Sequence, residues 1–337
     1  MANLSTNYMG LNLKNPIIAG ASNFVKDIDN IKKIEEAGAA AIVYKTLFEE
    51  QIELERLQLS EELNQYNERH AEMISLFPDI EHAGPTEHLM HLRKTVEAVT
   101  IPVIASLNCT FGETWVEYAK AIEQTGVNAI ELNFYSIPGD FKKEEKAIVN
   151  EQLDVVNQVK KSLRIPVSVK LSPFYTNVLN LIQMMYFEGV DGFVLFNRLF
   201  QPDIDIEKEE HHFNWHLSNP DDIRLPLRYV GLLHGEIHGS ICANTGIYTG
   251  ADVIKMLLAG ADCVQLVSTL YKHGFGQITK MLQEITDWMD HKKYEDIIKF
   301  RGKLSKKNMK DPFIYKRAQY VDILMKSEQI FIHYPQR

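Results

Sequence analysis

Eight short apolar runs, separated by amphipathic stretches, constrain the fold of this chain more than any other feature of its sequence. The runs are too short for buried helices and rich in Val and Ile, which is typical of strands covered on both faces. They lie at residues 17–22, 40–45, 103–108, 129–134, 167–172, 192–197, 240–245 and 263–268. This alternation predicts an α/β fold in which helices connect parallel strands.

The stretches between the apolar runs have the periodicity of helices. In one of them, Ile31 and Ile34 fall on one face and the pattern stops at Gly38. Similar stretches stop at Gly126 and Gly260. Glycine suits the position after a helix because that position commonly requires a positive φ angle. The periodicity therefore predicts a helix between most pairs of consecutive strands.

About eight strand–helix units in series predict a closed (β/α)8 TIM barrel rather than an open doubly wound sheet. The open sheet would carry a GxGxxG fingerprint after its first strand, and this chain has none there. We expect a single domain over residues 1–337, with the barrel at about residues 15–290. A long loop at residues 46–84 follows the second strand, and another long connection at residues 198–222 follows the sixth. A helical C-terminal extension is predicted at residues 291–337.

Charge and cysteine content narrow the class of protein. The chain has 36 Lys and Arg against 45 Asp and Glu, whereas nucleic-acid binding requires clustered basic residues. Cys109, Cys242 and Cys263 lie far apart, so no disulfide framework or zinc site is expected. Two of the three histidines at 209–216 are adjacent, and no metal site is predicted there. Without an apolar N-terminal region or a run of about 20 apolar residues, we expect a cytoplasmic protein that does not bind membranes.

Polar residues recur where the predicted strands end, at the face of a barrel where active sites form. They are Lys45, Asn108, Asn133, Lys170, Asn197 and Asn244. Any one of them alone could be a satisfied structural residue. Six together favour a polar ligand, because burying each unpaired polar group costs about 1–3 kcal/mol.

The segments after the last two predicted strands resemble a phosphate-binding site. Thr245 and Gly246 follow the seventh strand, and Ser268 and Thr269 follow the eighth. Barrels commonly bind phosphate at these two loops, through backbone N–H groups and a helix N-terminus. The alternative is a pair of tight turns that only require small residues.

Two lysines near a bound phosphate are compatible with two chemistries. Lys45 or Lys170 could form a Schiff base with a carbonyl substrate, as in an aldolase-type lyase. Alternatively, a lysine could stabilise the anionic reduced ring of a flavin. The asparagines at the strand ends favour the flavin, since aldolases more often place carboxylates around their lysine.

The order and spacing of these motifs resemble the dihydroorotate dehydrogenase family along almost the whole chain, in its soluble class without a membrane-associating extension. The matching stretches are GLNLKNPIIAGAS, VYKT with Lys45, IELNF with Asn133, IPVSVKLSP with Lys170, LFN with Asn197, and ANTGIYTGADVIKMLLAGADCVQLVSTLY. Members of this family are FMN-dependent (β/α)8 barrels. The resemblance therefore implies an FMN-dependent oxidoreductase with a small-molecule substrate.

The resemblance also implies roles for individual residues. Lys45 and Lys170 would contact the isoalloxazine ring, with Lys170 placed to stabilise negative charge at N1. The other residues implied to bind the flavin or its phosphate are Ala21, Ser22, Asn108, Asn133, Thr245, Gly246, Val267, Ser268 and Thr269. Substrate would be bound by Asn133, Asn197 and Arg198.

Three positions depart from the family pattern. The loop after the fourth strand reads Asn-Phe-Tyr-Ser-Ile-Pro instead of Asn-Leu-Ser-Cys-Pro, so Ser136 is the candidate base, with Lys45 as the other candidate catalytic residue. Residues 46–84 contain no counterpart of the loop that grips orotate. Arg198 replaces a small hydroxyl residue and could pair with a substrate carboxylate or with the acidic residues at 203–207.

Three functional hypotheses follow. The first is oxidation of dihydroorotate, or of a related substrate that becomes an enone, with hydride transfer to flavin N5 and reoxidation by a soluble electron acceptor. The second is a Schiff-base lyase that uses Lys45 or Lys170. The third is a flavin-binding protein without turnover. Similarity to soluble relatives also suggests a homodimer.

Overall fold

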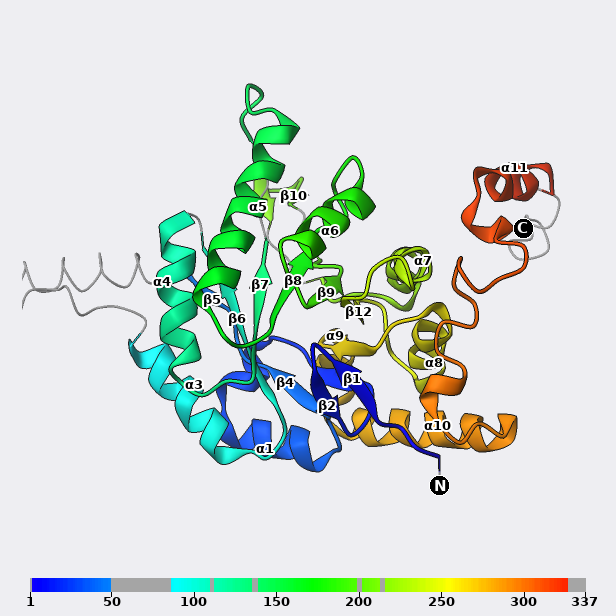
Figure 1. Cartoon of the computed structure of the whole chain (residues 1–337), viewed down its shortest axis with the longest axis horizontal. Coiled ribbons are helices and arrows are strands. Elements are labelled where there is room, and N and C mark those ends of the chain that lie inside the picture. The colour runs from blue at the N-terminus through cyan, green and yellow to red at the C-terminus, as the bar shows by residue number, and fades with distance from the viewer. Residues whose placement is uncertain are drawn as a thin grey trace, which may run out of the picture.

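Eight parallel strands form a closed barrel in the computed structural model (Figure 1). The structure describes residues 2–49, 86–109, 112–134, 139–198, 202–212 and 216–326. The barrel strands are β3 (Ile17–Ala19), β4 (Ala41–Val43), β6 (Val103–Asn108), β7 (Ala129–Asn133), β8 (Val167–Leu171), β9 (Gly192–Leu195), β12 (Ser240–Asn244) and β13 (Cys263–Leu266). Their order is β3–β4–β6–β7–β8–β9–β12–β13, and β13 pairs with β3 to close the ring. The predicted (β/α)8 barrel is confirmed.

Helices surround the barrel strands in Figure 1. They are α1 (Ile28–Glu36), α3 (Thr86–Ala98), α4 (Gly112–Glu123), α5 (Glu145–Ser162), α6 (Val178–Phe187), α7 (Arg224–Leu233), α8 (Gly250–Ala259), α9 (Ser268–His273) and α10 (Gly276–Lys292). Short 3-10 helices occur at Asn23–Lys26 and Pro220–Ile223. The glycines predicted to follow helices α1, α4 and α8 have φ angles of 107°, 88° and 123°. The predicted helix ends at these glycines are therefore confirmed.

Two antiparallel hairpins lie outside the barrel ring. β1 (Thr6–Tyr8) pairs with β2 (Leu11–Leu13), and β10 (Asp203–Asp205) pairs with β11 (Glu210–His212). The first hairpin is fixed at the start of β12 by a hydrogen bond of 2.9 Å from the Met9 amide to the Ser240 hydroxyl. Its Tyr8 side chain is fully buried among residues of the barrel interior. This hairpin therefore closes the amino-terminal end of the barrel, which the sequence analysis did not predict.

The two long connections differ in what the structure describes. β5 (Leu47–Phe48) extends the sheet after β4 by pairing with β6, but residues 50–85 of the predicted loop lie outside the described residues. The second connection contains the β10–β11 hairpin and returns to the barrel at residues 216–218. It thereby contributes to the carboxyl-terminal face of the barrel.

The C-terminal extension packs outside the barrel, as predicted, but up to residue 316 it consists mainly of turns. Backbone bonds from Gly302 to Leu257 and from Lys306 to Gly231, both 2.8 Å, fasten it to α8 and α7. A 3-10 helix at Ile297–Lys299 precedes these bonds, and the 3-10 helix Phe313–Tyr315 and the helix α11 (Arg317–Met325) follow them. In Figure 1, α11 lies at the edge of the molecule, away from the barrel strands.

Candidate active site

A cavity of about 870 Å³ opens at the carboxyl ends of the barrel strands. Most residues predicted to bind flavin or substrate line it: Ala21, Ser22, Lys45, Asn133, Lys170, Asn197, Arg198, Thr245, Gly246, Val267, Ser268 and Thr269. They lie at or just after the ends of seven of the eight barrel strands, and parallel strands bring their carboxyl ends to one rim. The structure thus gathers residues far apart in the sequence around one space.

Two predicted residues are not among those that line the cavity. Asn108 is buried, and its side-chain nitrogen donates a hydrogen bond of 2.5 Å to the backbone carbonyl of Asn133. This bond ties the end of β6 to the end of β7, and a role for Asn108 in flavin binding stays a prediction. Ser136, the candidate base, lies outside the described residues.

Asn133 and Asn197 hold each other at the rim. The Asn197 side-chain nitrogen donates to the Asn133 side-chain oxygen over 2.8 Å. Asn133 ends β7, and the backbone amide of Asn197 is bonded to the Leu171 carbonyl over 2.7 Å. Two amide groups with a fixed mutual orientation offer donors and acceptors to the edge of a heterocycle.

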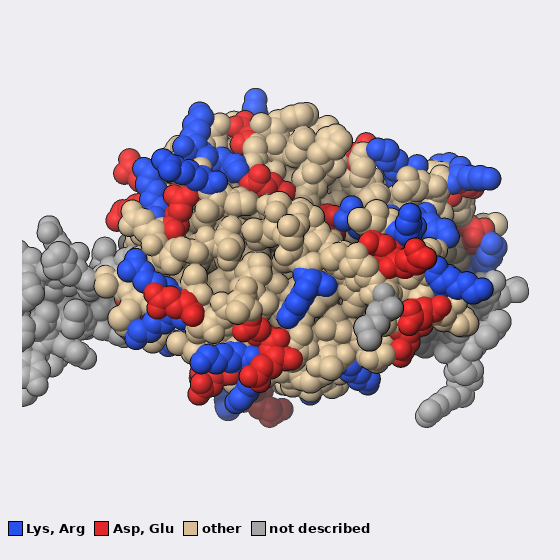
Figure 2. Space-filling view, turned by 60° about the horizontal axis from the view of Figure 1, so that its bottom comes forward, with Lys and Arg blue, Asp and Glu red and all other residues tan. Residues whose placement is uncertain are grey.

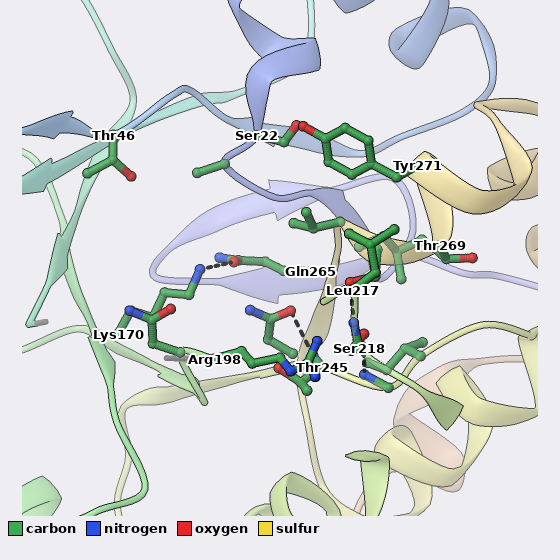
Figure 3. Close-up of a pocket in the computed structure, with 18 of the residues that line it drawn as sticks. Ser22, Thr46, Lys170, Arg198, Leu217, Ser218, Thr245, Gln265, Thr269 and Tyr271 are labelled. Atoms are coloured by element: carbon green, nitrogen blue, oxygen red, sulfur yellow. Dashed lines mark hydrogen bonds between the residues drawn. The ribbon is translucent and has the colours of Figure 1, made fainter. Parts of the chain in front are cut away.

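Lys170 projects from β8 into the cavity and is supported from below by two buried polar residues. Its Nζ lies 3.6 Å from Glu131 Oε1 and donates to Gln265 Oε1 over 3.5 Å, as drawn in Figure 3. Gln265 Nε2 in turn donates to Glu131 Oε2 over 2.5 Å. Glu131 is 1% exposed. This arrangement holds an ammonium group at one side of the cavity.

Lys45 lies at the rim near a neutral histidine. Burial, and secondly the positive charge of Lys45, lower the pKa of His88 to about 4, so the imidazole is uncharged at neutral pH. The next residue, Thr46, lines the cavity and shares a hydrogen bond of 2.8 Å with Ser106. The end of β4 thus places one cation and one hydroxyl beside the site of Lys170.

Across the cavity from Lys170, Figure 3 shows the hydroxyl residues Ser218, Thr245 and Thr269. Thr269 is 1% exposed, and its hydroxyl has no hydrogen-bond partner among the described residues. Gly246 has a φ of 75°, and a Cβ added to it would lie 2.3 Å from the backbone nitrogen of Ile223. The backbone of Ser218 donates to the Ser268 hydroxyl over 3.0 Å. This concave group can accommodate a phosphate.

Arg198 lines the cavity but is bound by groups of the chain itself. One guanidinium nitrogen donates to the His216 carbonyl oxygen, and the other lies 3.8 Å from the Asp222 carboxylate. The predicted alternative partner was the acidic segment at residues 203–207. The structure instead places Asp222, from the 3-10 helix before α7, beside the guanidinium.

Sequence analysis missed several residues of the site: Thr46, Phe48, Glu131, His216, Leu217, Ser218, Gln265 and Tyr271. Two of them had a readable signal, since Glu131 and Gln265 are polar residues inside apolar strands. Ser218 had none, because it lies in a long connection whose path is fixed only by tertiary contacts. Its carbonyl accepts hydrogen bonds from Tyr248 and Lys272.

On the face shown in Figure 2, basic and acidic side chains are intermixed around a broad region with few charges. Within the described ranges, no three side chains of the kinds that bind metal ions come together. None of the described helices is both long and apolar enough to span a membrane.

Comparison with known proteins identifies the family. The sequence profile described as Dihydroorotate dehydrogenase matches residues 3–289. The catalytic subunit of dihydroorotate dehydrogenase B (NAD(+)) from Thermoplasma volcanium is 28% identical over 315 residues, covering 90% of this chain and 98% of that protein. Dihydroorotate dehydrogenase A (fumarate) from Lactobacillus delbrueckii is 26% identical, covering 81% and 89%.

A more distant relative is named for dihydropyrimidine rather than for dihydroorotate. The chloroplastic dihydropyrimidine dehydrogenase (NADP(+)) of Arabidopsis thaliana is 22% identical over 219 residues, covering 59% of this chain and 51% of that protein. All three relatives are named as dehydrogenases of reduced pyrimidines. The chain belongs to the dihydroorotate dehydrogenase family, whose members are flavin-dependent dehydrogenases acting on CH–CH bonds.

Proposed function

We propose that the cavity binds FMN and that the enzyme oxidises dihydroorotate or a closely related dihydropyrimidine. One observation carries this proposal: a single cavity is lined by the lysines Lys45 and Lys170 and also by the small and hydroxyl residues after β12 and β13. Lys170 lies at one side of it, and Thr245 and Thr269 lie toward the other (Figure 3). A volume of about 870 Å³ lies within the range of about 300–1,000 Å³ usual for cofactor and ligand sites.

The phosphate end supports FMN rather than an unphosphorylated flavin. The Thr269 hydroxyl is buried without a partner in the described part of the chain, and such a group normally costs about 1–3 kcal/mol unless a ligand completes it. A phosphate oxygen would accept its proton. Gly246 lets the loop after β12 pack closely against the backbone before α7, because any side chain there would collide with that backbone.

The chemistry that FMN supplies when bound is hydride acceptance at N5. Lys170 would donate hydrogen bonds to the pyrimidine edge of the ring and favour negative charge there. Asn133 and Asn197, fixed by their mutual bond, would orient the polar groups of the substrate. Lys45 would lie beside both the flavin ring and the substrate. Together, these residues would hold the substrate against the flavin ring, with the carbon that loses hydride facing it. Such positioning leaves little freedom for misalignment.

The substrate must also lose a proton from the carbon next to the one that loses hydride. We propose Ser136 as the group that receives it, and Lys45 as the group that stabilises the charge that develops. A serine hydroxyl needs a neighbouring acceptor for its own proton. The electron acceptor is proposed to be a diffusible oxidant, as NAD(+) and fumarate are in the names of the relatives.

The Schiff-base alternative finds less support. An amine must be free to attack a carbonyl, and the Lys170 amine is engaged by Glu131 Oε1 at 3.6 Å and by Gln265 Oε1 at 3.5 Å. The remaining alternative is flavin binding without turnover. The experiment below distinguishes it from the proposed function.

The test is an anaerobic visible spectrum of the purified protein before and after dihydroorotate is added. We expect oxidised-flavin absorbance that bleaches on addition of the substrate. A flavin spectrum that dihydroorotate leaves unchanged would reject this substrate and leave the family's chemistry to another one. Failure to bind added FMN would reject the proposal entirely.

A further inference from the structure

Glu131 is a buried carboxylate that the flavin chemistry described above does not use. It sits on β7, two residues before Asn133, and is 1% exposed. Its Oε2 accepts a hydrogen bond from Gln265, whereas its Oε1 has none from any described residue and lies 3.6 Å from Lys170 Nζ. The carboxylate therefore faces the ammonium group that lines the cavity.

Packing alone does not account for this carboxylate. Burying an ion pair costs desolvation that its attraction often fails to offset, and an apolar pair of similar volume is commonly as stable or more stable. The neighbouring strand positions are apolar: Ile130 and Leu132 are fully buried. An acidic residue at the centre of this barrel is therefore better explained by an effect on the site than by stability.

The groups around Glu131 leave Lys170 as its charged partner. Burial raises the pKa of Tyr8 and of Cys263 well above their ordinary values, so both are uncharged at neutral pH. Gln265 bridges the pair by donating to Glu131 and accepting from Lys170. Among the described residues, Lys170 and Gln265 line the cavity and Glu131 lies behind them.

We propose that Glu131 is a positioning residue that sets the reduction potential of the bound flavin through Lys170. This inference rests on the FMN binding proposed above. The carboxylate offsets part of the positive field that Lys170 projects into the cavity. Their ion pair also draws the ammonium group toward β7. Both effects lower the preference of the site for the reduced, anionic flavin, which makes reoxidation by the electron acceptor easier.

The variant Glu131→Gln tests this proposal because it removes the charge and keeps the shape and a hydrogen-bonding group for Gln265. The positive charge of Lys170 would then act on the flavin without being offset by the Glu131 carboxylate. We expect the preference for reduced over oxidised FMN to rise about tenfold, read as an increase in midpoint potential during anaerobic reductive titration. Sulfite, which adds to flavin N5 and leaves negative charge at N1, should bind more tightly by a similar factor.

Three further variants make the result specific. Glu123→Gln is the control: Glu123 accepts bonds from the amides of Arg164 and Ile165, away from the cavity, and its midpoint potential should match the wild type. Lys170→Met should lower the preference for reduced FMN. In the Lys170→Met background, Glu131→Gln should change the midpoint potential much less than in the wild type, because the proposed effect acts through Lys170.

Two outcomes separate this inference from the proposed function. If wild-type protein binds no FMN, the proposed function fails and this inference with it. If FMN binds but Glu131→Gln leaves both the midpoint potential and sulfite affinity unchanged, or lowers them, only the inference is overturned. Should Glu131→Gln not fold, Glu131→Asp, which moves the charge away from Lys170, must give a smaller rise of the same sign, and no rise overturns the inference.

Discussion

Thr269 and Gly246 form the same end of the cavity for different physical reasons. Thr269 contributes a hydroxyl that needs a partner, and Gly246 contributes close backbone packing against Ile223 and a backbone conformation that side chains disfavour. Each can be changed with a matched control elsewhere in the chain. The two substitutions therefore separate recognition of the phosphate from the shape of its cradle.

Replacing Thr269 with Val should weaken FMN binding without destabilising the protein. The hydroxyl has no partner to lose among the described residues, whereas its bond to a phosphate would contribute about 1.5–3 kcal/mol, a loss of at least about tenfold in affinity. Titration with FMN and chemical unfolding of the free protein measure the two effects. The control Thr125→Val should show the reverse, because Thr125 donates to the Ile122 carbonyl over 2.7 Å.

Replacing Gly246 with Ala should cost both stability and FMN affinity. The new Cβ would lie 2.3 Å from the backbone nitrogen of Ile223, so the segment before α7 must move. Gly10 is the control, since its φ is 80° but nothing lies within 4 Å of an added Cβ. We expect Gly10→Ala to cost about 1 kcal/mol of unfolding free energy and to leave FMN affinity intact. Equal behaviour of the two variants would contradict this account of the cradle.

Residue-level prediction from sequence worked where a polar side chain ends an apolar run. Lys45, Asn133 and Lys170 were identified this way and line the cavity. Asn108 carried the same signal but its side chain bonds to the end of β7, because residue type and position along a strand do not determine which neighbour a side chain finds. Ser136, the candidate base, remains a prediction.

At the scale of elements, the start of α8 joins the phosphate end of the site to the outer layer. Asp252 and Thr249 form a capping box there, and the Asp252 carboxylate also accepts the backbone amide of Tyr248 over 3.1 Å. This network fixes the loop that leads from Gly246 into the helix. The stability that this hydrogen-bond network gives the protein should therefore depend on the charge of Asp252.

The variant Asp252→Asn should lower the free energy of unfolding by about 1 kcal/mol at neutral pH. Burial alone would raise the pKa of Asp252, but hydrogen bonds from Lys255, from Thr249 and from a backbone amide lower it below its ordinary value of 3.8. A lowered pKa means that the stabilisation is present above that value and lost as pH falls through the folded-state pKa.

Chemical unfolding across this acidic range measures the effect. The difference between wild type and Asp252→Asn should shrink as pH falls below about 4. Asp221→Asn is the control, because the Asp221 side chain is 87% exposed in its ion pair with Arg224, and its effect should stay below about 0.5 kcal/mol. A difference that grows toward low pH would rule out this role for Asp252.

Helices and strands were predicted well where the periodicity of the sequence defines them. They were predicted poorly where tertiary contacts determine whether an element forms. The helix ends at Gly38, Gly126 and Gly260 follow from the sequence because positive φ is a local requirement. The β1–β2 hairpin was not predicted, since its short strands are fixed by Ser240 and by burial of Tyr8 in the barrel. The turns of the C-terminal extension likewise depend on their bonds to α7 and α8.

At the scale of the whole molecule, FMN should stabilise the fold because the cavity draws its walls from strands spread over the whole barrel. A ligand that binds only the native state adds about 2.7 kcal/mol when its concentration is one hundred times its Kd. We expect FMN to raise the Tm of the free protein and riboflavin, which lacks the phosphate, to raise it less. Equal effects of the two flavins would argue against the phosphate cradle.

The barrel itself could be predicted from the count and spacing of apolar runs, because eight parallel strands with crossover helices have few ways to close. The single domain and the homodimer remain predictions. The substrate half of the site could not be derived, since the loop after Phe48 departs from the family pattern and Arg198 stands where a small residue was expected. The flavin half rests on strand ends, which periodicity locates.

The most direct measurement of the central claim is a crystal structure of the protein grown with FMN. The account predicts the phosphate against Thr245, Gly246 and Thr269, and the pyrimidine edge of the ring within hydrogen-bond distance of Lys170. Flavin bound outside this cavity, or bound within it with Lys45 and Lys170 directed away from the ring, would contradict the account.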